Sequence, residues 1–231
     1  MPSELTPTDD LAEIERRLSM PLVEAMTTQR AVRRVLPDPV DPAIVRRCIE
    51  LALEGPTGSN GQNWEFVVVT DRATKERFQV QYRRAWSLYG KAGERVRGED
   101  PQTARILKSV RWQVDHLPDV PVLVIACLRG GPKLPYVPMP AMANTGHYGS
   151  IYPSVQNLLL AARAVGLGAS LITLPLWSVT VARRILGLPL SVEPCCIVPL
   201  GWPIGRYGPK ARKPVDAVIH HERYGTATPA E

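Results

Sequence analysis

Short apolar runs rich in β-branched residues recur along the chain, between longer segments in which apolar residues return every three or four positions. The short runs predict strands, because such residues pack well on a buried pleated surface. The longer segments predict amphipathic helices. We expect strands at Phe66–Thr70, Val120–Leu128, Ala169–Thr173 and Cys195–Leu200, with a fifth at Val215–Ile219.

Local signals mark several helix boundaries. Asp41 followed by Pro42 is typical of a helix start, because the carboxylate caps the first amides and proline has no amide to satisfy. Gly166 and Gly187 are typical of helix ends. We expect helices at Leu11–Leu18, Leu22–Gln29, Pro42–Leu53, Ile151–Val165 and Val179–Leu186.

The segment from Ala73 to about His116 is helical in tendency but charged, and Gly98 and Pro101 interrupt it. Its charge predicts a mobile helical cover rather than a part of the core. The other helices and strands alternate with short links. We therefore predict an α+β fold in which helices flank both faces of a central sheet.

The chain has 231 residues, of which 45% are hydrophobic. That is enough for one domain over residues 1–231. No stretch reaches the roughly 18 consecutive apolar residues of a membrane-spanning helix. The polar, acidic start lacks the basic and apolar parts of a signal peptide. We expect a cytoplasmic protein without a membrane anchor.

The net charge of +6 comes from 28 basic and 22 acidic side chains. The basic residues form no block of five, and the aromatic residues do not alternate with them. Both features weigh against a nucleic-acid partner, whereas a phosphate-bearing ligand needs only a few cations. The four cysteines form no C-x-x-C pair and lie in apolar runs, which predicts buried thiols and no metal site.

Two segments far apart in the sequence each hold a pair of cations. Arg30 and Arg33 are three positions apart and share one side of a helical turn. Lys210 and Arg212 share one face of an extended chain. Each pair suits a phosphate or a carboxylate, and each is also consistent with a solvated basic surface.

Two further segments suit a flat ligand. The loop from Gly55 to Trp64 combines glycines with Asn60 and Gln62. Its backbone can approach a ring closely while the amides offer donors and acceptors. Thr173 places a hydroxyl near the end of a predicted strand. Taken alone, the loop is equally consistent with an ordinary turn, and Thr173 with a strand threonine.

The order and spacing of these segments resemble the nitroreductase-like family of FMN-dependent oxidoreductases, over roughly Met26 to Ile219. That family has an Arg-Arg-Ser-x-Arg-like start, a Pro-Ser-x-x-Asn-x-Gln-Pro-Trp loop and a helix ending in Gly-Leu-Gly. A Pro-Leu-Gly-Tyr-Pro-like turn and a Lys/Arg-x-Arg-x-Pro segment follow. The counterparts are Arg30–Arg33, Pro56–Trp64, Gly166–Gly168, Val198–Pro203 and Lys210–Pro214.

The resemblance implies a nitroreductase-like fold with a mostly antiparallel sheet and a bound FMN. It implies that Arg30, Lys210 and Arg212 hold the FMN phosphate. Arg33 is implied to lie near the N1/O2 end of the ring, where a cation stabilises the charge of reduced flavin. Ala31, which stands where relatives have serine, belongs to the same motif. The resemblance also assigns Pro56, Thr57, Asn60 and Gln62 to the isoalloxazine and ribityl chain, and Thr173 and Leu174 to flavin N5 and O4.

The resemblance further implies an intertwined homodimer with FMN at the interface, contacted by both chains. A C-terminal arm, about residues 203–231, crosses to the partner, and residues 73–116 form a candidate substrate lid. The implied activity is ping-pong hydride transfer from NAD(P)H through flavin N5 to an electron-poor acceptor such as a nitroaromatic or a quinone. We name no catalytic acid or base, because the flavin carries this chemistry.

Other functions are consistent with the sequence. A specialised relative uses its flavin for reductive dehalogenation or for oxidation. A non-catalytic FMN-binding protein is yellow but is not reduced by nicotinamides. A nucleic-acid-binding protein is colourless and retains DNA in a salt-sensitive way.

Overall fold

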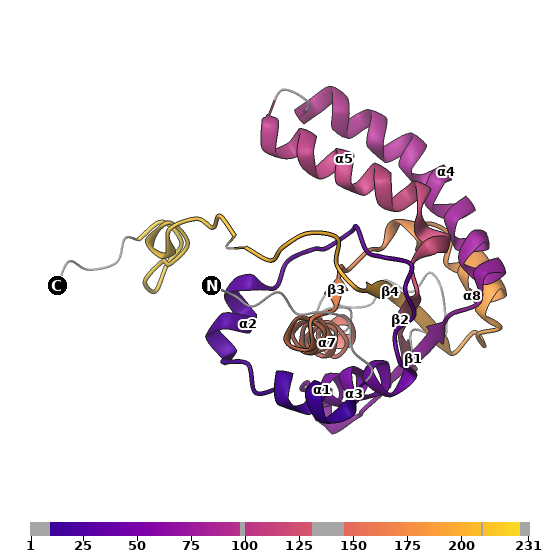
Figure 1. Cartoon of the computed structure of the whole chain (residues 1–231). Coiled ribbons are helices and arrows are strands. Elements are labelled where there is room, and N and C mark those ends of the chain that lie inside the picture. Colours follow the sequence, from indigo (N-terminus) through magenta and orange to yellow (C-terminus); the bar gives the residue numbers. More distant parts are fainter. Residues whose placement is uncertain (1–9, 98–99, 131–145, 209, 227–231) are drawn as a thin grey trace.

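The computed structural model describes residues 10–97, 100–130, 146–208 and 210–226. Within these ranges the chain forms a four-stranded antiparallel sheet with helices on both faces (Figure 1). This arrangement confirms the predicted α+β fold with a mostly antiparallel sheet. In the order β1-β2-β4-β3, the strands are β1 (Trp64–Val69), β2 (Val122–Arg129), β4 (Val192–Gly201) and β3 (Gly168–Ala169).

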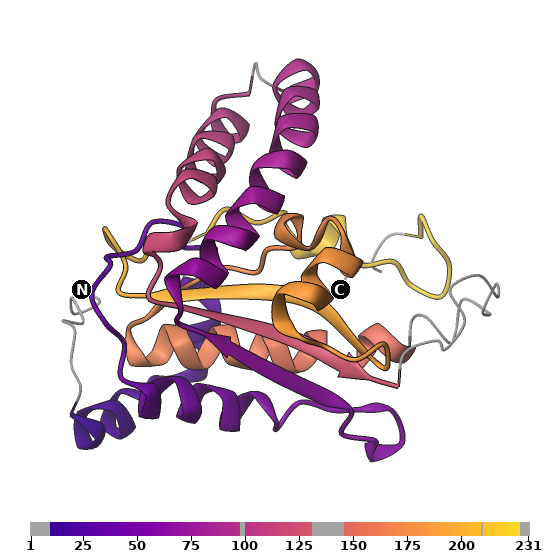
Figure 2. The same ribbon diagram turned by 90° about the vertical axis from the view of Figure 1, so that its right-hand side faces the viewer.

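Two hydrophobic cores lie on opposite faces of the sheet. Alternate residues of β2 enter each core, because successive side chains of a strand point to opposite faces: Val124 belongs to one core and Ile125 to the other. Figure 2 shows the helices of the two layers below and above the strands. The first layer contains α1 (Leu11–Arg17), α3 (Pro42–Ala52) and α7 (Tyr152–Val165), and the second α4 (Arg72–Arg97), α5 (Pro101–Asp115) and α8 (Val179–Leu186).

The helix boundaries follow the local signals in the sequence. The Asp41 carboxylate accepts a hydrogen bond of 2.7 Å from the Ala43 amide, and Pro42 is the first residue of α3. Helices α7 and α8 end at Gly166 and Gly187, whose φ angles of 95° and 67° lie in the left-handed region that glycine favours. The short helix α2 (Leu22–Thr28) packs against α7.

The prediction that the charged segment lies outside the core is wrong for part of it. Phe78, Tyr82 and Ala85 of α4 are at most 1% exposed and belong to the second core. Their spacing of four and three places them on one side of the helix. Lys75 is buried on that side as well, where its Nζ donates to the Val120 carbonyl at 2.8 Å, whereas Glu76, Arg77, Arg83 and Arg84 are exposed. No helix in the described ranges, α4 included, is long and apolar enough to cross a membrane.

Two predicted strands differ from the structure. The strand expected at Ala169–Thr173 is shortened to β3, after which Ile172 alone forms a bridge with Ile197 of β4. A turn of 3₁₀ helix, η3 (Leu174–Leu176), then begins. The strand expected at Val215–Ile219 is instead the exposed 3₁₀ turn η4 (Val215–Ala217), and none of the strands in the described ranges pairs with it. Similar turns occur at η1 (Gly58–Asn60) and η2 (Leu117–Asp119).

All four cysteines are buried and free, as the apolar runs predict. Burial raises the pKa of the Cys48, Cys127 and Cys196 thiols to about 12 and raises that of Cys195 as well. Very little thiolate is therefore present at pH 8, and the thiolate is the form that reacts.

We expect Ellman's reagent to label the folded protein at least about 100-fold more slowly than a free thiol. In denaturant it should label four thiols per chain. Rapid labelling of even one thiol before unfolding would contradict this expectation.

Candidate functional site

The segment Arg30–Val35 lies as extended chain along the edge of the sheet. Ala31 forms a parallel bridge with Ala169 of β3. Gly168 makes this approach possible, because a Cβ atom at that position would lie 2.7 Å from a side-chain carbon of Val32. The arginine-rich segment is thus attached to the strand that precedes the predicted flavin-contacting residues.

The C-terminal segment returns across the end of α7 and is held there by Tyr207. Its hydroxyl donates to the Leu167 carbonyl at 2.6 Å, and the buried Arg163 guanidinium lies 4.0 Å from the centre of its ring. Further along, Lys210 Nζ donates to the Met26 carbonyl of α2 at 2.8 Å. These contacts bring residues near the C-terminus next to the start of the arginine-rich segment.

Arg30 of the first predicted cation pair consequently lies near both cations of the second pair. Burial lowers the pKa of Lys210, and the positive charges of Arg212 and Arg30 lower it further. Grouped cations repel one another, so the arrangement favours an anion as ligand.

A cavity of about 440 Å³ opens beside these cations, which is a volume typical of small-molecule sites. Arg30 and Arg33 both line it. The prediction that these arginines share a helical turn is wrong, because the segment is extended. Ala31, Ala211 and one face of α5 complete the lining. A smaller cavity of about 170 Å³ is also lined by Arg30, Arg33 and Ser109.

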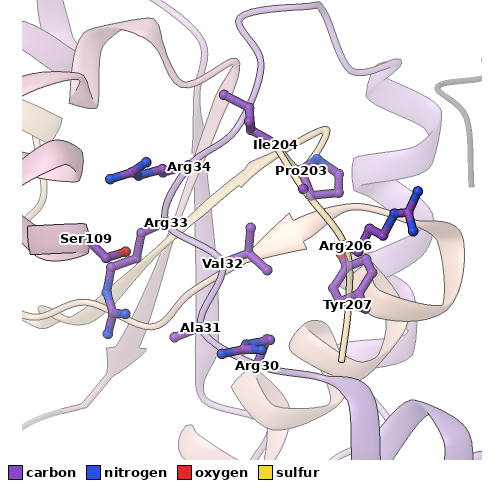
Figure 3. Close-up of a pocket in the computed structure, with 11 residues that line it drawn as sticks. Arg30, Ala31, Val32, Arg33, Arg34, Ser109, Pro203, Ile204, Arg206 and Tyr207 are labelled. Atoms are coloured by element: carbon purple, nitrogen blue, oxygen red, sulfur yellow. The ribbon is translucent and has the colours of Figure 1, made fainter. Parts of the chain in front are cut away.

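Arg33 is the partly buried cation of this cavity. Burial lowers the pKa of its guanidinium, and the neighbouring Tyr82 opposes that shift. No ion pair among the described residues joins Arg33 to a carboxylate. Figure 3 shows its side chain beside Ser109 of α5, diverging from that of Arg34. A desolvated cation without an acidic partner is a good binding group for an anionic part of a ligand.

A buried polar network fixes the helices above this cavity to the sheet. The Tyr82 hydroxyl of α4 donates to Gln113 Oε1 of α5 at 3.3 Å, and Gln113 Nε2 donates to Ser170 Oγ at 2.9 Å. All three residues are 1% exposed. Sequence reasoning did not find this network. Its one local signal is an uncharged amide next to Val114, on the apolar side of an otherwise polar helix.

Thr173 and Leu174 follow β3 at the entrance to η3. Thr173 is exposed, whereas Leu174 packs against the second core. Both lie a few residues beyond Ala169, which carries the bridge to the arginine-rich segment. They therefore lie on the same edge of the sheet as that segment.

The polar loop after α3 is built differently from the rest of the site. Asn60 and Gln62 have φ angles of 52° and 47°, and Gln62 Nε2 donates to Asn60 Oδ1 at 3.1 Å. The Gln62 amide donates to Thr57 Oγ1 at 3.2 Å. At the start of the loop, before Pro56, a Cβ on Gly55 would lie 2.8 Å from the Ser154 backbone. The loop thus packs against the beginning of α7.

This loop lies far from the cations of its own chain. The Arg129 amide, at the last residue of β2, donates to the Asn63 carbonyl at 2.7 Å. The arginine-rich segment joins the sheet near Leu200, which pairs with Val122 at the first residue of β2. These attachment points are separated by the length of β2, about 23 Å at the usual strand rise. The predicted site residues therefore fall into two groups at opposite ends of the sheet.

The residues in the described ranges contain no cluster of three or more His, Cys, Asp or Glu side chains that could hold a metal ion. The chemistry of the candidate site is thus that of arginine, lysine, amide and hydroxyl groups.

Comparison with known proteins identifies the family. The nitroreductase family matches residues 26–202. An NADH dehydrogenase of Thermus thermophilus is 28% identical over 211 residues, covering 87% of this chain and 97% of that protein. An iodotyrosine deiodinase of Danio rerio is 26% identical over 181 residues, covering 77% of this chain and 58% of that protein.

Solved structures agree on the fold. An iodotyrosine deiodinase bound to FMN and 3-iodo-L-tyrosine superposes with a TM-score of 0.64 at 24% identity, covering 88% of this chain and 99% of that one. The NADPH:FMN oxidoreductase of Vibrio harveyi, complexed with NAD⁺, superposes with a TM-score of 0.65 at 19% identity, covering 89% and 79%. With the family match over most of its length, this chain belongs to the nitroreductase family.

Proposed function

We propose that the chain is an FMN-dependent oxidoreductase that uses a reduced nicotinamide to reduce an electron-poor acceptor, such as a nitroaromatic or a quinone. The observation that carries the proposal is the convergence of Arg30, Lys210 and Arg212 beside a cavity of about 440 Å³. When bound, FMN supplies ping-pong hydride transfer from NAD(P)H through its N5 atom. Family membership supports an oxidoreductase.

The cations fit the dianionic tail of a flavin mononucleotide. Arg30, Lys210 and Arg212 come from two distant parts of the sequence, and their mutual repulsion is relieved by a phosphate. The fixed Lys210–Met26 hydrogen bond holds this cluster in place before the ligand arrives. In our proposal these three side chains bind the FMN phosphate.

Arg33 fits the ring end of the same ligand. Its guanidinium is partly desolvated and has no carboxylate partner in the described chain. A cation fixed in this way stabilises the negative charge that reduction places at the N1/O2 end of a flavin. Thr173 and Leu174, on the same sheet edge, are proposed to approach N5 and O4.

The loop residues Pro56, Thr57, Asn60 and Gln62 belong to the proposed site only if a second chain supplies them. Their separation from the cations of their own chain, about 23 Å along β2, supports a homodimer in which each flavin contacts both chains. Exposed apolar side chains on two segments support it further, because exposed apolar surface often marks a protein–protein interface. They lie on α2 and in the C-terminal arm: Leu22, Val23, Met26, Val215, Val218 and Tyr224, between 53% and 93% exposed.

Anaerobic reduction tests the proposed function. The purified protein should be yellow, and NADH or NADPH added without oxygen should bleach its absorbance near 450 nm. Adding a nitroaromatic or a quinone should restore the colour. A yellow protein that neither nicotinamide bleaches would be a non-catalytic FMN-binding protein. A colourless protein that retains DNA would overturn the proposal.

Reductive dehalogenation is the second candidate, favoured by the likeness to iodotyrosine deiodinases. We propose α4 and α5 as the substrate cover, since their outer turns project beyond the sheet (Figure 2). Incubating the chemically reduced protein with 3-iodotyrosine or with a nitroaromatic separates the two candidates. Iodide release at a rate comparable to nitro reduction would favour the dehalogenase.

A further inference from the structure

One face of α5 forms a wall of the cavity. Gln102, Arg105, Ile106 and Ser109 all line it. Their spacing of three, one and three residues places them on a single side of the helix. The inner end of this helix is fixed to the sheet by the hydrogen bond from Gln113 to Ser170. The four side chains therefore form one face of a helix whose inner end is attached to the segment after β3.

Arg105 lies well above the sheet. It is eight residues before Gln113, which corresponds to about 12 Å along the helix axis. Its Nε donates to the Pro101 carbonyl of its own first turn at 3.3 Å, and no ion pair in the described ranges joins it to a carboxylate. A cation of α5 thus lines the same cavity as Arg30 and Arg33, from the helix side.

More arginines line the cavity than the proposed flavin contacts use. Arg30, Arg33 and Arg105 line it, and its lining among the described residues includes no Asp or Glu. The proposed function assigns Arg30 to the phosphate and Arg33 to the ring, so Arg105 remains without an assigned anion. Beside Arg105, the exposed Ile106 offers an apolar contact and Ser109 a hydroxyl.

We propose that Arg105 recognises a negatively charged oxygen group, a carboxylate or a phosphate, on the second substrate that enters this cavity beside the flavin. The inference rests on the proposed function and specifies its substrate class: an aromatic or heteroaromatic molecule that carries an anion. Ile106 packs against its ring and Ser109 hydrogen-bonds to a polar edge. The anion comes from the acceptor or from the nicotinamide donor.

Benzoate and benzamide test this inference, because they have the same shape and differ in charge. Calorimetry on the protein as purified should show benzoate binding about tenfold more tightly than benzamide, the gain typical of a charge-assisted hydrogen bond. Arg105→Gln should reduce that preference to twofold or less without changing the flavin content. Lys108→Gln is the matched control, because Lys108 is exposed on the same helix but lines neither cavity.

A second arm identifies the source of the anion. NADPH differs from NADH by a phosphate. If Arg105→Gln loses a preference for NADPH over NADH but keeps the preference for benzoate over benzamide, the anion belongs to the donor, and the inference is supported. Loss of benzoate preference would assign it to the acceptor. If Arg105→Gln leaves both preferences unchanged, the inference is overturned. Calorimetry does not require a bound flavin. If the protein is colourless but still prefers benzoate in a way that depends on Arg105, the proposed function is refuted and the inference about Arg105 is not.

Discussion

Replacing Arg212 by alanine is expected to weaken FMN binding about 10- to 100-fold. A hydrogen bond between a guanidinium and a phosphate contributes roughly 1.5–3 kcal/mol, which corresponds to a loss of this size. In the structure Arg212 is exposed and donates to the Ala211 carbonyl next to it at 3.1 Å. Its removal should therefore leave folding unchanged. Quenching of FMN fluorescence during titration with apoprotein measures the dissociation constant.

Arg47→Ala is the control for this measurement. Arg47 lies on α3 and pairs with Glu15 and Glu50, away from the cavity. The charge lost is the same, so any general effect of the net charge on an anionic ligand appears in both variants. Equal weakening by the two substitutions would count against Arg212 as a phosphate ligand.

A dimer that combines one chain of each of two FMN-binding-deficient variants should regain one of its two flavin sites. One variant carries Lys210→Ala and Arg212→Ala, and the other carries Asn60→Gly and Gln62→Gly. Glycine is chosen because Asn60 and Gln62 have positive φ angles, which glycine adopts without strain. If each site combines the cations of one chain with the loop of the other, the mixed dimer contains one intact site and one doubly defective site.

We therefore expect about half a flavin per chain in the mixed dimer, bound with wild-type affinity, and almost none in either parent at limiting FMN. Differently tagged chains, co-expressed and purified on both tags, provide the sample. Mixed dimers in which every site binds weakly would place the loop and the cations of one site on the same chain. A monomeric protein would contradict the proposal that two chains share each flavin site.

Elements with strong local chemistry could be predicted closely. The Asp41 cap, Pro42 and Gly187 determine where α3 begins and α8 ends, and each acts within one turn of the chain. Strand lengths depend instead on partners far along the sequence. Val215–Ala217 has strand-like composition, but no strand of the described sheet pairs with it, and its backbone forms η4.

The buried side of α4 was missed because charged residues are as frequent in its sequence as apolar ones. Phe78, Tyr82 and Ala85 do recur at helical spacing, and that spacing rather than the mean polarity determines which side is buried.

The candidate site could be predicted in part. The cation pairs at Arg30–Arg33 and Lys210–Arg212 follow from residue spacing; in the structure the first pair lines one cavity, and the second lies near Arg30. The sequence carries no sign that the Asn60 loop lies at the other end of β2, because that separation arises from the register of the sheet. The contribution of α5 through Arg105 was also missed, because a single exposed arginine on a polar helix has no distinguishing pattern.

The central claim is that side chains from both ends of the sequence bind the phosphate of one FMN. Comparing FMN with riboflavin, which has the same ring but no phosphate, tests it most directly. The wild-type protein should bind FMN at least about 100-fold more tightly than riboflavin, since several charge-assisted hydrogen bonds depend on the phosphate. In the Lys210→Ala/Arg212→Ala variant this ratio should fall at least tenfold, with riboflavin affinity unchanged. Equal affinity of the wild-type protein for FMN and riboflavin would contradict the account.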